Sequence, residues 1–257
     1  MHSMRSMRFM QHLRALPSLL LAASLGLALG AGDASATPVS VPFGDSVHTW
    51  PGYQNGTSDD GRDTIGHPDL QGGVAVFENG LLTSIRIDYI GPFSLAASGR
   101  GTVIPCDLFI DVGGDGNWDY VMRLVAAPQT PVADYAALEI LDVSGETEAY
   151  LWSGTDNQGH WRGFLIRDDH PYAWAGGGDL FGTGSLTAPS LLATGTQSLF
   201  FHFDVGIRTG DEVIIGFAAS CANDVLYERI SAPVPEPSAA LLFAAGLFIA
   251  TRRAALR

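Results

Sequence analysis

The sequence contains no lysine, and arginine supplies every basic side chain. The 14 arginines stand against 27 aspartates and glutamates, which gives a formal net charge of −13. Six arginines lie near the two ends, so residues 37–237 carry 14 − 6 = 8 arginines, 26 acidic residues and a net charge of 8 − 26 = −18. Because nucleic-acid binding requires cationic groups that displace counterions, this composition excludes it. An acidic surface instead attracts divalent cations or basic partners.

The chain also lacks an amphipathic helical pattern in residues 37–231, and it lacks a fixed-period repeat. Short runs of alternating apolar and polar residues, separated by Gly, Asp, Asn and Pro, are typical of strands and turns. We therefore predict an all-β fold, a two-sheet antiparallel β-sandwich of jelly-roll type, with a closed barrel as the alternative. The predicted strands are 82–90, 107–112, 118–125, 136–143, 148–154, 160–168, 198–207 and 211–220.

Motifs of familiar catalytic chemistry are missing as well. The sequence has no G-x-S-x-G elbow, no H-E-x-x-H helix and no phosphate-binding glycine loop. Its histidines are scattered, and no pair of carboxylates stands out from the many acids. We expect a protein without enzymatic activity, and the alternative is a surface enzyme that acts on glycans.

Cysteine is scarce. Cys106 and Cys221 are the only two, and they lie 115 positions apart. The first 36 residues read as a signal peptide, with a basic leader, the apolar run 15–32 and small residues up to a cleavage position at Ala36; an uncut membrane anchor is the alternative. Export places the chain in an oxidising compartment, where Cys106 and Cys221 are expected to form a disulfide, with two buried free thiols as the alternative.

Acidic residues gather in two segments that could hold a metal ion. In "DVGGDGNWD", Asp111, Asp115, Asn117 and Asp119 alternate with glycines, which suits the oxygen ligands and tight turn of a Ca²⁺ loop. Gly113 and Met122 occupy two ligand positions of an EF-hand, so an EF-hand is not expected. The alternative is a hairpin turn in which the Asp and Asn side chains bond to their own backbone.

The second acidic segment lies in the long polar stretch 47–73. It contains Asp59, Asp60 and Asp63, with Asp69 nearby. The later segment "CANDV", with Asn223 and Asp224, could complete a calcium site with these acids, because jelly-roll modules often hold calcium between their two chain ends. A solvated acidic loop is the alternative.

Aromatic residues beside Gly, Asp and Asn could present rings to sugars, or could instead complete the core. They are Trp50, Tyr53, Trp152, Trp161, Tyr172 and Trp174.

The C-terminal 26 residues, 232–257, have three parts. A proline-rich step, "APVPEP", precedes the apolar run 238–251, which as a helix of 14 residues is about 21 Å long and shorter than the hydrocarbon core of about 30 Å. Arginines in 252–257 follow and favour the cytoplasmic side of a membrane. An exposed step, a marginal apolar helix and a basic end form the layout of a processed sorting signal.

This tail resembles the PEP-CTERM sorting domain of Gram-negative bacteria. Pro235, Glu236 and Pro237 match its namesake motif, and Arg252 and Arg253 match its basic end. The resemblance implies export, recognition by an exosortase and transient residence in the inner membrane. Delivery to the cell surface or the extracellular polysaccharide matrix then follows. The resemblance covers residues 232–257 alone and says little about the function of residues 37–231.

Together these features predict a domain order of signal peptide (1–36), β-sandwich (37–231) and sorting tail (232–257). We expect a non-enzymatic surface protein associated with exopolysaccharide, whose glycan binding is assisted by Ca²⁺. A purely structural matrix module is a further alternative. The expected partners are the export machinery, the exosortase and extracellular polysaccharide.

The sorting motif gives the first testable expectation. Replacing Glu236 with alanine should leave an unprocessed precursor in the inner-membrane fraction, because the acidic residue between two prolines is the distinguishing feature of the motif. Immunoblots of fractionated cells would detect the precursor by its larger mass. Normal surface delivery of Glu236→Ala would contradict the assignment.

Overall fold

A computed structural model describes residues 37–47, 50–51, 62–64, 66–93, 103–125, 135–153, 160–161, 164–165, 170–188 and 194–233. Residues Thr37–Val234 form one compact unit. The described residues form strands and turns and contain no helix, which confirms the all-β prediction. Within this part of the chain, accordingly, no helix is long and apolar enough to cross a membrane.

Ten strands form one antiparallel sheet, and four short strands form two separate pairs. The order in the large sheet is β1-β2-β3-β12-β11-β6-β5-β4-β13-β14, while β7 pairs with β10 and β8 with β9. The strands are β1 (Val39–Phe43), β2 (Asp69–Glu78), β3 (Leu81–Ile90), β4 (Pro105–Val112), β5 (Tyr120–Leu124), β6 (Tyr135–Asp142), β7 (Tyr150–Trp152), β8 (His160–Trp161), β9 (Phe164–Leu165), β10 (Pro171–Trp174), β11 (Asp179–Thr187), β12 (Thr196–Arg208), β13 (Glu212–Ala219) and β14 (Val225–Ser231).

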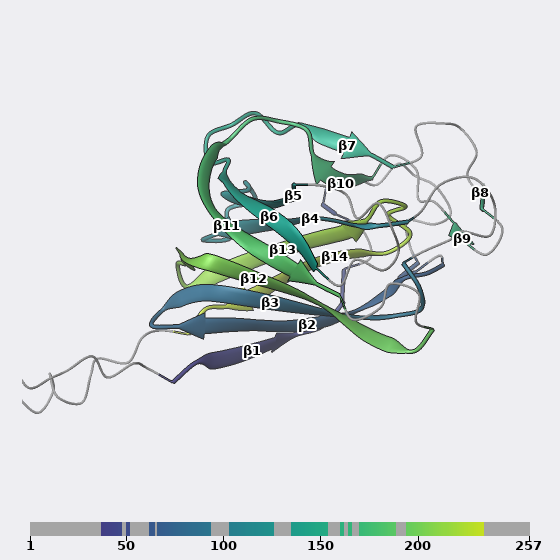
Figure 1. The fold of residues 1–257 in the computed structure, drawn as a ribbon, viewed down its shortest axis with the longest axis horizontal. Helices are drawn as coiled ribbons and strands as arrows, with labels where there is room; N and C mark the ends of the chain where they lie inside the picture. The colour runs from purple at the N-terminus through teal and green to yellow at the C-terminus, as the bar shows by residue number, and fades with distance from the viewer. Residues whose placement is uncertain are drawn as a thin grey trace, which may run out of the picture. The chain divides into compact units, whose positions relative to one another are not determined.

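The large sheet curls so that its two halves face each other (Figure 1). Four strands separate β12 from β13 in the sheet, yet the rings of Phe201 on β12 and Phe217 on β13 lie 5.8 Å apart. The two edge strands, β1 and β14, also come into contact. The inner faces of all ten strands therefore enclose one core, and the sheet is almost closed on itself.

Strand β3 shows how the sequence fixes this arrangement. Ile85, Ile87 and Tyr89 are fully buried, while Arg86 and Asp88 point to the other face and form an ion pair of 2.9 Å. The alternation predicted for this segment is thereby confirmed. A period of two places every apolar side chain on the core face, because successive residues of a strand point to opposite sides.

Strands β4 and β13 are buried on both faces. An apolar composition on both faces, as in β13, is typical of a strand that is covered on each side. A second core covers their outer face, built around the rings of Trp50, Phe109, Trp118, Tyr150 and Trp174. Strands β7 and β10 lie over this face (Figure 1). The buried carboxylate of Asp107 on β4 fixes β10, because it accepts a 2.8 Å hydrogen bond from the backbone N–H of Trp174.

Several predicted elements differ from the structure. Within the predicted strand 148–154 the structure has the three-residue strand β7, which pairs with β10 and not with a strand of the large sheet. The predicted strand 160–168 consists of the two-residue strands β8 and β9. The pattern missed β1, β2, β10, β11 and β14.

Two aromatic rings of the second core pack directly against Gly216 on β13. A Cβ at this position would lie 2.6 Å from the Trp118 ring and 3.3 Å from the Trp50 ring. We expect Gly216→Ala to lower the free energy of unfolding by about 1–3 kcal/mol, as overpacking of a core does.

The matched control is Gly195→Ala, where a Cβ meets nothing within 4 Å. We expect Gly195→Ala to stay within about 0.5 kcal/mol of the wild type. Urea unfolding followed by tryptophan fluorescence measures both variants. Equal stability of the two would mean that the rings do not press on Gly216.

Candidate metal centre

The first predicted metal loop connects β4 to β5. Its hydrogen bonds match the alternative interpretation, a turn that bonds to itself. Asp111, 1% exposed, accepts bonds from the N–H groups of Gly114 (2.9 Å) and Gly116 (2.7 Å). Asp119 accepts a 2.6 Å bond from the N–H of Val112.

The exposed part of this turn follows the same pattern. Asp115 accepts bonds from the backbone and the side chain of Asn117, at 2.9 and 3.1 Å. The carboxylates that were candidate ligands are therefore engaged by the turn's own donors.

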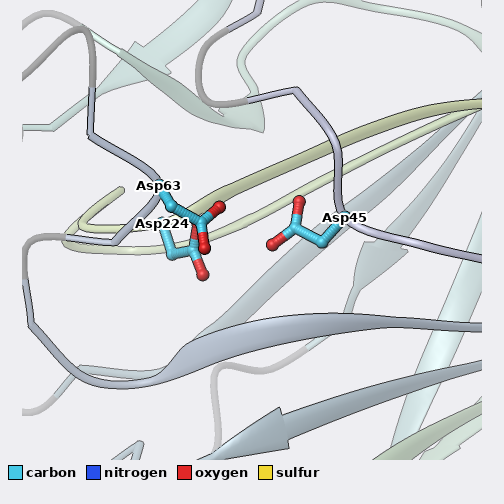
Figure 2. A group of neighbouring side chains, drawn as sticks. All are labelled: Asp45, Asp63 and Asp224. Carbon is cyan, nitrogen blue, oxygen red and sulfur yellow. The ribbon is translucent and has the colours of Figure 1, made fainter.

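A different group of acids comes together where the two edges of the sheet meet. Asp45 follows β1, Asp63 precedes β2, and Asp224 lies in the turn between β13 and β14. Each offers one carboxylate oxygen, and these oxygens all lie within 4.8 Å of one another. We call these three residues the acidic triad; Figure 2 shows their carboxylates pointing toward one another.

The chain reaches this place because the segment after β1 crosses to β14. The backbone N–H of Ser46 donates to the Glu228 carboxylate, and the indole N–H of Trp50 donates to the Leu226 carbonyl at 3.3 Å. Both acceptors lie on β14. The crossing brings Asp45 to the turn that carries Asp224.

Asp224 is held firmly in this turn. It is 1% exposed, and its two carboxylate oxygens accept bonds from the N–H groups of Leu70 (2.5 Å) and Val225 (2.9 Å). The neighbouring Asn223 donates a 3.0 Å bond to the Pro68 carbonyl and accepts one from the thiol of Cys221. These bonds tie the start of β2 to the β13–β14 turn.

Asp45 is the unusual member of the acidic triad. Both of its carboxylate oxygens are buried from solvent, and neither has a hydrogen-bond partner in the structure. Burial of a carboxylate without a partner is unfavourable, so such a group usually holds a proton or a cation.

Burial, the largest cause, and the negative charges of Asp224, Asp63, Glu228 and Asp69 together raise the pKa of Asp45 to about 9. Burial also raises the pKa of Asp224 to about 7, against the lowering effect of its bond from Leu70. At neutral pH the ion-free centre therefore retains protons. A hard cation such as Ca²⁺, which prefers several oxygen ligands, could replace them.

The sequence anticipated part of this centre. Its pairing of Asp63 with Asp224 agrees with the structure. Asp59 and Asp60 lie outside the described residues, and the side chain of Asp69 accepts a 2.6 Å bond from Gln71. Asp45 was missed, since a single aspartate after a strand carries no motif.

The two cysteines, Cys106 and Cys221, are buried free thiols in the structure, which is the alternative to the predicted disulfide. Burial raises the pKa of the Cys106 thiol, and the charge of the adjacent Asp107 adds to this effect. The thiol of Cys221 donates to the Asn223 side chain at 2.6 Å.

Most of the candidate sugar-stacking rings that the structure describes belong to the second core. Trp50 and Trp174 are 1% and 4% exposed, and Tyr172 packs against the same cluster. Trp152 is exposed, and its ring lies 5.8 Å from that of Tyr150. The core interpretation therefore holds for Trp50 and Trp174.

The predicted processing and sorting residues lie outside the described residues. They are the cleavage position Ala36, the motif Pro235, Glu236 and Pro237, the apolar segment 238–251, and Arg252 and Arg253. Comparison of the chain with family models, with curated proteins and with solved structures finds no match.

The pKa values predict how stability depends on pH without added metal. Asp45, Asp224 and Asp107 are raised from 3.8 to about 9, 7 and 6, so the folded protein binds more protons than the unfolded chain above the ordinary carboxyl pKa. The free energy of unfolding should therefore fall as pH rises.

Melting temperatures in EDTA, taken from pH 5 to pH 9, would measure this trend. Asp45→Asn should flatten the part between pH 7 and pH 9. A melting temperature that rises across the range in EDTA would contradict the protonated centre.

Proposed function

We propose that this chain is an exported, non-enzymatic surface protein whose β-body holds a divalent cation, Ca²⁺, at the acidic triad. The observation that carries the proposal is the Asp45 carboxylate, which lacks both solvent and hydrogen-bond partners and faces two further carboxylates. A cation would neutralise the three neighbouring carboxylates at once, which a proton on one of them cannot do.

The bound ion would act first as a structural clamp. The acidic triad joins the exit of β1, the approach to β2 and the turn before β14, which are remote in sequence and meet where the sheet closes. An ion that binds only the folded protein stabilises it by mass action. Ca²⁺ is favoured over Mg²⁺ because loop carboxylates suit its irregular coordination, whereas Mg²⁺ demands a near-ideal octahedron.

Export and sorting are supported by the two ends of the sequence. The proposed route runs from the signal peptide, cut after Ala36, to an inner-membrane intermediate held by residues 238–251. Exosortase recognition of Pro235, Glu236 and Pro237, with Arg252 and Arg253 as the basic end, then delivers the body to the cell surface or matrix. An acidic body that carries Ca²⁺ suits that setting, because the ion can also bridge anionic polymers.

We further propose association with extracellular polysaccharide and a two-layered, jelly-roll-like body. What supports the layered description is that Phe201 and Phe217, from opposite halves of the curled sheet, share one core. The Cys106–Cys221 disulfide stays a prediction for the oxidised, exported protein.

Calcium should raise the melting temperature of the protein relative to EDTA. Saturation at about 100 times the dissociation constant stabilises by about 2.7 kcal/mol, which for a body of this size corresponds to about 5–10 °C. Asp45→Asn should abolish the response and leave the protein in EDTA at least as stable as the wild type, since it removes a buried acid.

Asp115→Asn is the matched control, because Asp115 is an acid of the other predicted metal loop. It should keep the full calcium response. If Asp115→Asn lost the response and Asp45→Asn retained it, the ion would lie in the β4–β5 turn and the proposed centre would be wrong.

A further inference from the structure

The outer face of the strands β1, β2, β3, β12 and β11 is exposed or partly exposed to solvent, and its side chains are regularly placed. Strand register aligns two rows of outward side chains across it. One row is Pro42, Val74, Arg86, Phe200 and Thr187 on β1, β2, β3, β12 and β11; the other is Ser40, Val76, Ser84, His202 and Ser185 on the same strands. The residues between these rows, among them Ile85 and Phe201, are buried in the inner core. We call this surface the open face.

One aromatic ring stands at the centre of the open face. Phe200 is 45% exposed, although its strand neighbours Leu199 and Phe201 are fully buried. Directly across the strand pair stands Arg86, whose side chain is 42% exposed. An exposed ring on a rigid central strand costs hydrophobic free energy in the isolated protein, and it offers a flat apolar surface to a ligand.

Polar groups with fixed orientation surround the ring. Asp88 accepts bonds from Arg86 (2.9 Å) and from the hydroxyl of Ser198 (2.5 Å), so it holds both neighbours in place. The second row adds an imidazole and three hydroxyls. Hydroxyl, imidazole, guanidinium and carboxylate groups together provide donors and acceptors on one plane.

The charges of the open face nearly cancel, in contrast to the acidic body. Arg86 pairs with Asp88, and at the border Arg123 pairs with Glu139 at 2.7 Å. Asp204 accepts a 2.8 Å bond from Thr183. Where no Ca²⁺ bridges them, an anionic polymer would be repelled by the acidic body, and a cationic polymer would find no excess of negative charge on this face. Charge complementarity therefore favours an uncharged partner for the open face.

From these observations we propose that the open face binds an uncharged, hydroxyl-rich polysaccharide chain, with a sugar ring on Phe200. The strand spacing of about 4.8 Å sets a regular separation between neighbouring side chains along each row, which suits a linear polymer of similar units. A protein partner fits less well, because protein interfaces have apolar centres depleted of charge, whereas an ion pair flanks the single large ring here. The inference rests on the proposed polysaccharide association and names its surface.

Native gel electrophoresis of the full chain in gels cast with dextran, β-glucan or galactomannan, and with alginate as the anionic polymer, would test the proposal. At least one neutral polymer should retard the wild type. Phe200→Ala and Arg86→Gln should each weaken that retardation at least fivefold in apparent dissociation constant. Phe181→Ala, which removes an exposed ring outside the two rows, should leave it unchanged.

Each other outcome overturns the open face in a distinguishable way. Retardation that survives both Phe200→Ala and Arg86→Gln would leave polysaccharide association standing on another surface. Retardation by alginate alone would remove the open face and leave an association with anionic polymers that Ca²⁺ bridges. Retardation by no polymer would remove the polysaccharide association as well. Self-association of the wild type in sedimentation runs, lost in Phe200→Ala, would make the face a contact between copies. The same gels run with Ca²⁺ and with EDTA separate these results from the cation centre.

Discussion

Closure of the ten-stranded sheet is the constraint on which the rest of the structure depends. To enclose one core, the sheet must bring β1 against β14, and this junction collects the carboxylates of Asp45, Asp63 and Asp224. Their mutual repulsion and the burial of Asp45 oppose closure, so protons or a cation must neutralise them. Closure of the sheet thus creates the proposed ion site, and a bound ion would in turn stabilise the closed sheet.

The second core depends on a long connection between two strands of the same sheet. A long excursion leaves the sheet after β6 and returns at β11, and β7 and β10 within it cover the aromatic face of β4 and β13. Strands β4 and β13 are thereby buried on both sides, while β1, β2, β3, β12 and β11 keep an exposed outer face. These two sets of strands can therefore take different tasks, one for stability and one for contact with other molecules.

Alternation of apolar and polar residues was sufficient to find strands such as β3, β12 and β13, because each has at least one regular buried face. The same criterion missed β11, whose sequence "DLFGTGSLT" has few large apolar residues. Gly184 there is needed for close approach, since a Cβ would lie 2.2 Å from the His202 carbonyl oxygen. Strand β11 therefore forms because of its contacts with neighbouring strands, and these contacts cannot be read from its own sequence.

The candidate metal centre likewise has one part that the sequence could predict and one part that it could not. Proximity of Asp63 and Asp224 could be predicted because both lie in acidic or amide-rich loops near the ends of the body. Asp45 could not, since its role depends on the path of the segment after β1 across to Glu228 and Leu226. The acids of the β4–β5 turn looked more like a metal loop, yet their oxygens serve backbone donors, which are invisible in the sequence.

The pairing of strands in this sheet also governs when it can form. β4 finds one neighbour, β5, immediately, but its other neighbour, β13, lies near the far end of the body; β3 likewise waits for β12. Such remote pairings form slowly and late. A chain with such pairings stays unfolded until its C-terminal strands are available. It can therefore pass through a narrow channel in an extended state and fold only on the far side.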